Sequence, residues 1–288
     1  PINPLAGKST GPLDHRDHRK LLVIDGRVAF LGGINISNVY AASSSGRHKK
    51  AALNNKSVSV PWRDTHVQIE GPVVAEYQKL FLATWEQQDG EALTGAHYFP
   101  RLKPVGQDIV HAIGSSADEP YSKIYVTLVS AINNAERLVY LTNAYFVPDP
   151  QLLDALKNAA VRGVDVRIIL PSQTDFWVVF HAGRSHYDEL LQAGVKIYER
   201  QNALLHSKTA LIDGVWSCVG STNLDWRSFV HNNEIDAVVL GENFARQLND
   251  MYTGDLAESI RIDSDTWRRR SLGVRIKEIS ARVWAYWL

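Results

Sequence analysis

The feature that most constrains this chain is a short pattern, His-x-Lys-x4-Asp, which occurs once near the start of the chain and again in its second half. The spacing from the His to a following Gly and to a following Asn is also the same in both copies. The repeated residues are His18, Lys20, Asp25, Gly32 and Asn35, and then His206, Lys208, Asp213, Gly220 and Asn223. Internal repetition predicts two structural units with one plan. Because the repeated side chains are mostly reactive rather than apolar, we expect the two units to build one active site between them.

The charge of the chain is balanced, with 31 basic and 31 acidic residues. No overall field draws it to nucleic acid, so we expect no nucleic-acid partner and only local affinity for phosphate. The single cysteine, Cys218, falls in an apolar run and is predicted to be a buried strand residue. The sequence contains no apolar run long enough to span a bilayer.

Each motif is predicted to lie on a β-hairpin. Residues 20–24 are apolar and β-prone, Asp25-Gly26 is a turn dipeptide, and 28–31 returns; Asp213-Gly214 repeats the device. The two motif aspartates are therefore interpreted first as turn residues, although both remain candidate catalytic residues.

Strand and helix patterns alternate through the second unit, which predicts an α/β fold with a mixed, largely parallel sheet flanked by helices. A long series of such patterns precedes the second motif, whereas the first motif stands close to the start of the chain. We therefore expect the first unit to be truncated at its N-terminal side. The helices are expected at about 72–85, 120–134, 150–161, 182–192, 242–255 and 272–288. The predicted regions are 1–100 (the rest of a first lobe), 101–265 (a second lobe) and 266–288 (an amphipathic helix).

Two further segments can each be interpreted in two ways. Residues 41–60 are rich in Ser, Asn and Lys, and their basic cluster at 47–50 is interpreted as part of a solvated loop rather than a phosphate contact. The C-terminal segment 272–288 has apolar residues at near-helical spacing. It could be an interfacial membrane helix or a helix packed on the domain, and we favour packing.

The motif residues suit phosphodiester chemistry. A His two positions before a Lys on a strand points to the same side, so imidazole and ammonium share one space. Asn35, Asn223 and the Ser221 hydroxyl could donate to non-bridging phosphate oxygens. One imidazole could attack phosphorus to form a phosphohistidine while the other transfers protons. The lysines would offset charge, and we expect no metal and no other cofactor, because no metal-ligand spacing occurs.

Each histidine also needs an acidic partner to fix its tautomer. Glu234, which follows the second motif, is the candidate partner of His206. Asp64, which follows the first motif once the loop at 41–60 is treated as an insertion, is the candidate partner of His18. Both acids stand just before an apolar strand, which supports this pairing within each unit.

On these residues the chain resembles the phospholipase D superfamily, whose members carry two such motifs at a shared site. Further stretches resemble the bacterial cardiolipin synthases; they are Gly32-Gly33-Ile34-Asn35, Pro61-Trp62-Arg63-Asp64, Tyr145-Phe146-Val147-Pro148-Asp149, Gly163-Val164-Asp165-Val166, the run from Gly220 to Ser228, and Tyr286-Trp287-Leu288. The resemblance implies transfer of a phosphatidyl group to phosphatidylglycerol, with phosphatidylglycerol or, in some relatives, phosphatidylethanolamine as donor.

The resemblance also implies that His18 is the nucleophile and His206 the acid, and that the protein works at the bacterial cytoplasmic membrane, held peripherally or through a segment outside this chain. Two alternatives remain. Water could be the acceptor, giving a phospholipase D or another phosphodiesterase, since both reactions pass through phosphohistidine. A non-catalytic lipid- or phosphate-binding module is disfavoured, because His and Lys are intact in both motifs.

Overall fold

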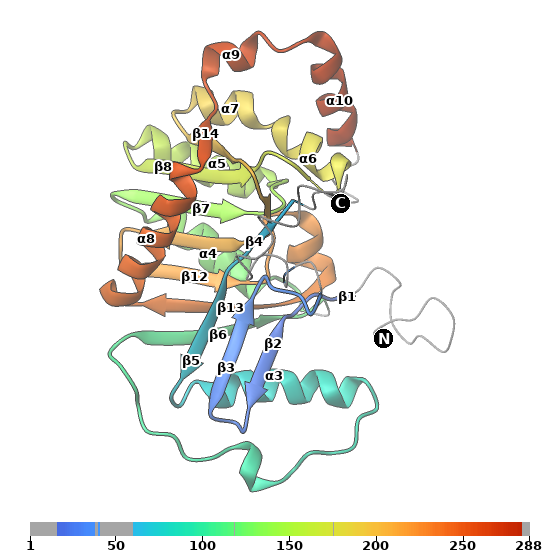
Figure 1. The fold of residues 1–288 in the computed structure, drawn as a ribbon, viewed down its shortest axis with the longest axis vertical. Helices are drawn as coiled ribbons and strands as arrows, with labels where there is room; N and C mark the ends of the chain where they lie inside the picture. Colours follow the sequence, from blue (N-terminus) through green and yellow to red (C-terminus); the bar gives the residue numbers. More distant parts are fainter. Residues whose placement is uncertain (1–15, 38–39, 41–59, 118, 175, 284–288) are drawn as a thin grey trace, which may run out of the picture.

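The structure is a computed structural model that describes residues 16–37, 40, 60–117, 119–174 and 176–283 (Figure 1). The basic cluster at 47–50 and the terminal Tyr286-Trp287-Leu288 lie outside the described residues. Within the described parts the expected mixed α/β architecture is confirmed, with helices flanking a large central sheet.

Within the described residues, the central sheet has nine strands in the order β1-β13-β12-β11-β7-β8-β9-β14, with β6 pairing on β13. Neighbours β7, β8 and β9 are parallel, as are β1 and β13, while the other pairs are antiparallel. The strands are β1 (Arg16–Asp17), β6 (Ile109–Ser115), β7 (Leu138–Asn143), β8 (Asp165–Pro171), β9 (Lys196–Arg200), β11 (Lys208–Ile212), β12 (Trp216–Gly220), β13 (Asn232–Leu240) and β14 (Ser259–Arg261).

Helices cover both faces of this sheet. The apolar sides of α4, α5 and α7 pack with strand residues such as Val139, Ile168 and Ile197 in the main core, and α8 covers the opposite face at Leu211 and Val219. Pro150 begins α5 at the predicted position, and the side chain of Asp149 caps it. The helices of this unit are α4 (Lys123–Asn133), α5 (Pro150–Val161), α6 (Trp177–Arg184), α7 (Tyr187–Gln192), α8 (Glu242–Ala257), α9 (Ser264–Arg268) and α10 (Leu272–Val283), with a π-helical turn η2 (Arg227–His231).

The single helix expected over 182–192 is wrong, because the chain forms two helices, α6 and α7, with a break at Ser185 and His186. The hydroxyl of Ser185 donates to the carbonyl of Ala182 at 2.6 Å, a local bond that competes with helix continuation. Cys218 is buried on β12, as predicted.

The first unit is smaller in this chain. Its antiparallel sheet runs β2-β3-β5, with α3 beside it, and its inner face packs on β13 through Ala29, Leu31, Ile235 and Ala237 (Figure 1). The predicted hairpin and the following strand and helix are confirmed. The elements are β2 (Leu21–Ile24), β3 (Val28–Gly32), β5 (His66–Glu70), α3 (Val74–Gln87) and a 3-10 turn η1 (Ala96–Tyr98).

Two very short parallel pairings join the units. Strand β1, just before the first motif, pairs with β13 of the second unit. Strand β10 (Leu204–Leu205), just before the second motif, pairs with β4 (Trp62–Arg63) of the first unit. Each motif histidine therefore follows directly after a short strand that pairs with the other unit.

Candidate active site

The first motif histidine is held by a carboxylate of the second unit. Pairing of β1 with β13 aligns Asp17 with Asn233, and the backbone N–H of His18 donates to the carbonyl of Asn233 at 2.9 Å. The next residue on β13 is Glu234, whose two carboxylate oxygens lie 3.0 and 2.9 Å from Nδ1 of His18. The side chain of Glu234 is fully buried.

The second motif histidine is held in the same way by the first unit. Pairing of β10 with β4 aligns Leu205 with Arg63, and the backbone N–H of His206 donates to the carbonyl of Arg63 at 2.8 Å. The following residue, Asp64, places Oδ2 at 2.8 Å from Nδ1 of His206.

The predicted pairing of histidines and acids is therefore wrong, although all four residues were identified. Glu234 bonds to His18 rather than His206, and Asp64 bonds to His206 rather than His18. The reason is the exchange of short strands between units, which places each histidine beside the strand that carries the other unit's acid. Each repeat thus supplies the carboxylate that contacts the motif histidine of the other repeat.

The glycine that follows each motif histidine at the repeated spacing allows this arrangement. A side chain on Gly32 would collide with the carbonyl of Thr65, and one on Gly220 with that of Ile235 and with Asp236. Thr65 and Ile235 are the residues directly after the two partner acids. Close packing of the motif hairpin on the acid-bearing strand accounts for glycine at both positions.

Buried neighbours orient Glu234. The hydroxyl of Ser221 donates to Oε2 at 2.6 Å and the amide of Asn232 donates to Oε1 at 3.2 Å. Burial alone would raise the pKa of Glu234, but His18 and Ser221 lower it below its ordinary value, so the carboxylate stays charged. In this structure the O–H of Ser221 is directed at the acid, and its donation to a phosphate stays a prediction.

A different set of neighbours orients Asp64. The hydroxyl of Tyr40 donates to Oδ2 at 3.1 Å and lies 3.2 Å from Nδ1 of His206, while the backbone N–H of Thr65 donates to Oδ1 at 2.8 Å. The ring of Trp62 packs 5.4 Å from that of His206. Sequence analysis missed Tyr40, and no repeat marks it, since the second unit has Ser228 at the corresponding offset.

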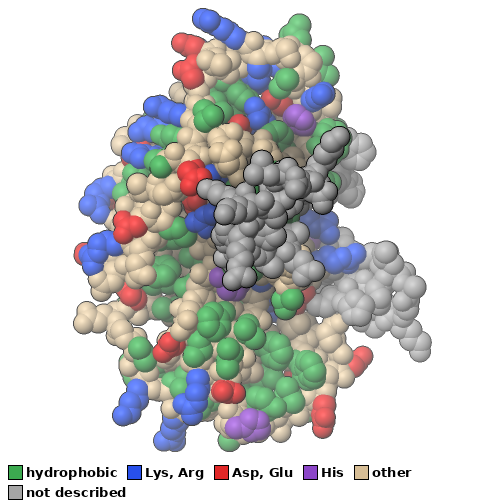
Figure 2. Space-filling model, viewed as in Figure 1, with side chains coloured by type: hydrophobic (Ala, Val, Ile, Leu, Met, Phe, Trp, Pro, Cys, Tyr) green, Lys and Arg blue, Asp and Glu red, His purple; other side chains and the backbone are tan. Residues whose placement is uncertain are grey.

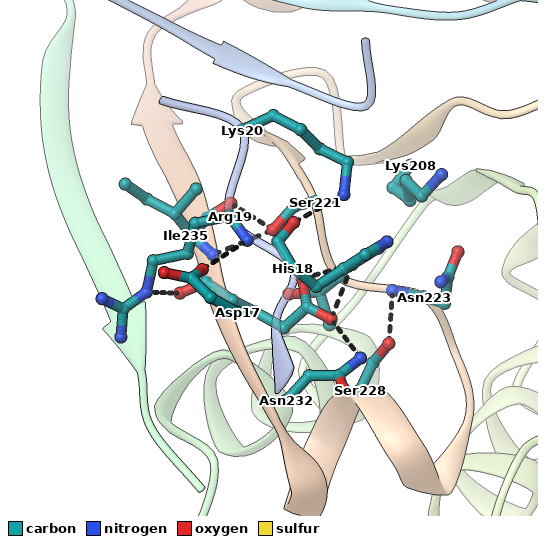
Figure 3. A network of polar contacts seen from close by, with 12 residues as sticks. Asp17, His18, Arg19, Lys20, Lys208, Ser221, Asn223, Ser228, Asn232 and Ile235 are labelled. Carbon is teal, nitrogen blue, oxygen red and sulfur yellow. Dashed lines mark hydrogen bonds and ion pairs between the residues drawn. The ribbon is translucent and has the colours of Figure 1, made fainter. Parts of the chain in front are cut away.

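The two lysines are anchored alike. The ammonium of Lys20 donates to the carbonyl of His18 at 2.6 Å, and that of Lys208 donates to the carbonyl of His206. Burial lowers the pKa of Lys20 to about 8 and that of Lys208 to about 7, although nearby Glu234 and Asp64 oppose the shift in both. Figure 3 shows Lys20, Lys208 and the far end of the His18 ring facing one space.

The histidine of the second unit is the more deeply buried of the two. Burial lowers the pKa of His206; its bond with Asp64 opposes this, and the charges of Lys208 and Lys20 add to it. The effect of Lys20 on His206 and on Lys208 indicates that groups of the first motif lie within electrostatic range of the second.

The two motif asparagines differ. Asn223 is buried beside this space (Figure 3), and within the described part of the chain its Oδ1 has no hydrogen-bond partner. Asn35 lies on the loop after β3 and is exposed. A phosphate-binding role for both asparagines stays a prediction.

The motif aspartates lie outside the site, so their candidacy as catalysts is wrong. Each stands in a left-handed turn, with φ 54° at Asp25 and φ 53° at Asp213, at the end of its strand away from the lysine. The length of strand that separates Lys208 from Asp213 corresponds to about 16 Å. The carboxylate of Asp213 instead accepts backbone N–H groups of Glu136, Arg137 and Leu138 at 2.8–3.0 Å.

The site can therefore bind an oxyanion between two ammonium groups and present two oriented imidazoles to it. Because Nδ1 of each histidine faces a carboxylate, Nε2 is the atom directed away from that acid and available for chemistry. Among the residues that the structure describes, no group of three or more His, Cys, Asp or Glu side chains is arranged to hold a metal ion.

Comparison with known proteins places this geometry in context. Residues 128–256 match the family described as "Cardiolipin synthase, PLD-like domain". A cardiolipin synthase from Geobacillus sp. WCH70 is 37% identical over 94% of this chain and 52% of its own length. A cardiolipin synthase from Listeria innocua is 34% identical over 94% of this chain and 54% of its own length. The chain thus spans about half the length of the curated relatives it matches.

The fold also matches a solved structure. The phosphatidylserine synthase of Haemophilus influenzae superposes on 94% of this chain and 71% of its own, with a TM-score of 0.66 and 11% sequence identity. At that identity the likeness concerns the fold alone, and it agrees with the mixed α/β architecture described above.

Proposed function

Because this chain belongs to the phospholipase D superfamily and is similar to cardiolipin synthases along nearly its whole length, we propose that the protein is a phosphatidyltransferase that makes cardiolipin. The observation that carries the proposal is the crossed pair of dyads, His18 with Glu234 and His206 with Asp64. Two oriented imidazoles beside two lysine ammonium groups meet both requirements of phosphodiester transfer, a nucleophile and a proton donor.

His18 is proposed as the nucleophile. The contact of Nδ1 with Glu234 favours the tautomer that leaves the lone pair on Nε2, and the ring is the more accessible of the two, with 26% of its side chain exposed against 7% for His206. In the first step Nε2 bonds to phosphorus of the donor lipid and the bond to the headgroup oxygen breaks. The negative charge of Glu234 stabilises the positively charged phosphohistidine.

His206 is proposed as the acid and base. Its protonated Nε2 gives a proton to the leaving glycerol oxygen in the first step, and the neutral ring removes a proton from the acceptor hydroxyl in the second. That oxygen then bonds to phosphorus as the bond to His18 breaks. Burial favours neutral His206 in the empty site, and a bound phosphodiester anion offsets the nearby lysine charges and favours the imidazolium.

Lys20 and Lys208 are proposed to neutralise the non-bridging oxygens, with Asn223 as a further donor. We propose phosphatidylglycerol as acceptor and as usual donor, with phosphatidylethanolamine as an alternative donor. The substrates place the protein at the surface of the bacterial cytoplasmic membrane. In the described part of the chain, no helix has the length and apolar content needed to cross a bilayer.

The test is to supply the full-length protein with phosphatidylglycerol labelled in the glycerol headgroup. Cardiolipin and free labelled glycerol in equal amounts are expected. Phosphatidic acid as the main product would instead identify water as the acceptor and make the protein a hydrolase. Release of no product in the presence of vesicles and of soluble short-chain lipid would leave only a binding module.

A further inference from the structure

We propose that α10 (Leu272–Val283) docks the protein on the surface of a phospholipid bilayer that carries anionic lipid. The proposal rests on the proposed function, since it names the surface that supplies the lipid substrates. Its basis is a stripe of large aliphatic residues that face solvent. The stripe consists of Leu272, Ile276, Ile279 and Val283, whose exposed fractions are 74%, 63%, 65% and 75%.

These four residues are spaced by four, three and four positions, which places them on one face of a helix. A helix of a globular protein ordinarily turns such a stripe toward the core. Here the opposite face is inward, with Glu278 and Ala281 buried. The favoured interpretation, a helix packed on the domain, therefore holds, but the face that packs is not the one that carries the aliphatic stripe.

Polar anchors fix the helix in this orientation. The guanidinium of Arg270 donates to Glu278 at 2.9 Å and to Asp188 of α7 at 2.7 Å, so an ion-pair network holds the inward face. Ala281 packs with Val147 and Val179 in a small apolar cluster beneath α10 and α6. The exposed stripe is thus a consequence of defined packing and not of a detached helix.

The charge around the stripe is complementary to an anionic bilayer. Between residues 264 and 283 there are six basic side chains and two acidic ones, in a chain whose total charge is zero. The acidic Glu278 is buried and paired, whereas Lys277 and Arg282 are exposed on the sides of the helix, Arg282 within 3.9 Å of Glu189. Figure 2 shows basic and apolar side chains together at the upper right, where Figure 1 places α10. Amphipathic helices of this composition lie in the membrane interface.

The helix is connected to the end of the sheet that carries the site. Val147, which packs against Ala281, donates its backbone N–H to Leu224 at 2.8 Å. Leu224 is adjacent to Asn223 beside the lysines, so a short chain of contacts links α10 to the phosphate-binding space. Docking through α10 would bring that end of the sheet close to the lipid headgroups.

A second copy of the chain is the less favoured occupant. The stripe is one helix of 12 residues, about 18 Å long, and a two-fold contact through it would set the basic side chains of two copies against each other. An anionic bilayer offers both an apolar layer for the stripe and counter-charges for its flanks.

The test measures co-sedimentation of this chain with vesicles of phosphatidylglycerol and phosphatidylethanolamine. The variant Ile276→Glu with Ile279→Glu should bind at least about tenfold more weakly, because it places charges in the stripe that docking would bury in the bilayer. The matched control, Ile109→Glu with Val161→Glu, changes two equally exposed aliphatic residues on β6 and α5 and should bind as the wild type does. Equal melting temperatures of the two variants establish that both are folded.

Several results would overturn the proposal: wild type that does not bind, stripe and control variants that bind equally, or a stripe variant that converts a dimer to a monomer while vesicle binding persists. Turnover of short-chain phosphatidylglycerol below its micelle concentration separates docking from chemistry. The stripe variant should retain that turnover and lose activity on vesicles at least about fivefold. Loss of both activities to the same extent would also contradict a docking role, whereas absence of soluble turnover in the wild type would count against the proposed function alone.

Discussion

The two halves of the site share the same pairing of a histidine with a carboxylate, but they differ in how far the histidine is exposed to solvent. His18 is partly exposed. Its acid, Glu234, is held by Asn232 of the same strand, β13, and by Ser221, which directly follows the neighbouring strand β12. His206 is nearly covered and its acid is held by Tyr40 and a backbone N–H. The two dyads are therefore alike in construction and different in exposure, and this difference is the basis for the proposed roles of His18 in attack and His206 in proton transfer.

The strands that carry the motifs also differ in how well their side chains are shielded from solvent. In the second unit Ala210 and Ile212 of β11 are buried in the core that α4 covers. At the equivalent positions of β2, Leu22 and Ile24 are 56% and 45% exposed. The outer face of β2 is therefore open to solvent, whereas the matching face of β11 is covered.

The largest expected effect comes from removing either imidazole. His18→Ala and His206→Ala in the full-length protein should each lower kcat by at least about 10⁴-fold, because neither half can supply both the nucleophile and the acid. Rates of cardiolipin formation measure this, with His111→Ala on β6 as the control that keeps activity. Activity close to wild type in either motif variant would refute a shared site.

Replacement of each acid by its amide tests the crossed pairing. Glu234→Gln and Asp64→Asn should each lower kcat by on the order of 10²- to 10³-fold, since an amide cannot stabilise the imidazolium. NMR of the Nδ1–H signals of the two rings distinguishes the partners. Glu234→Gln should shift the signal of His18 and leave that of His206 largely unaltered, and Asp64→Asn should do the reverse. The opposite assignment would restore the pairing within each unit.

A smaller effect is expected from pH on anion binding. Below pH 7 both lysines are protonated, and as pH rises Lys208 loses its charge near 7 and Lys20 near 8. Affinity for sulfate, whose own charge is constant in this range, should therefore fall about tenfold or more from pH 6 to 9. Calorimetry at fixed ionic strength measures it, with Lys123→Gln as a control outside the site. Affinity independent of pH would show that the lysines do not bind the anion.

The smallest effect on activity is expected from substitution of the motif aspartates. These substitutions should instead lower the stability of the protein, and by different amounts in the two units. Asp213→Ala removes the acceptor of three backbone N–H groups and should lower the free energy of unfolding by about 1–2 kcal/mol. Asp25→Ala, at an exposed turn, should lower it by less. Urea unfolding compares the two, and turnover per folded molecule should stay within about twofold of wild type. A folded but inactive Asp213→Ala variant would return the residue to the site.

Sequence repetition identified the histidines, the lysines and the hairpins that carry them, because these follow from local spacing. It also identified Glu234 and Asp64 as the acids. It could not assign them to their histidines, since a pseudo-symmetric pair of units offers the same spacing for pairing within a unit and between units. Only the two-residue strands β1 and β10 decide the matter, and such short strands have no recognisable pattern.

Two other features could not be predicted from the sequence, for similar reasons. Tyr40 contacts a histidine, His206, that is far away in the sequence, and it has no counterpart in the repeat. The apolar spacing of α10 was visible, but spacing alone does not say which side of a helix faces the domain. That side is decided by the ion pairs of Arg270 with Glu278 and Asp188.

The central claim is that histidines from both units converge on one phosphorus atom. A crystal structure of the full-length protein with vanadate, which mimics five-coordinate phosphorus, tests it most directly. We expect one vanadate bonded to Nε2 of His18, with Nε2 of His206 within hydrogen-bonding distance of the opposite apical oxygen and both lysines on the equatorial oxygens. Vanadate bound to one histidine, with the other imidazole outside the same pocket, would contradict the account.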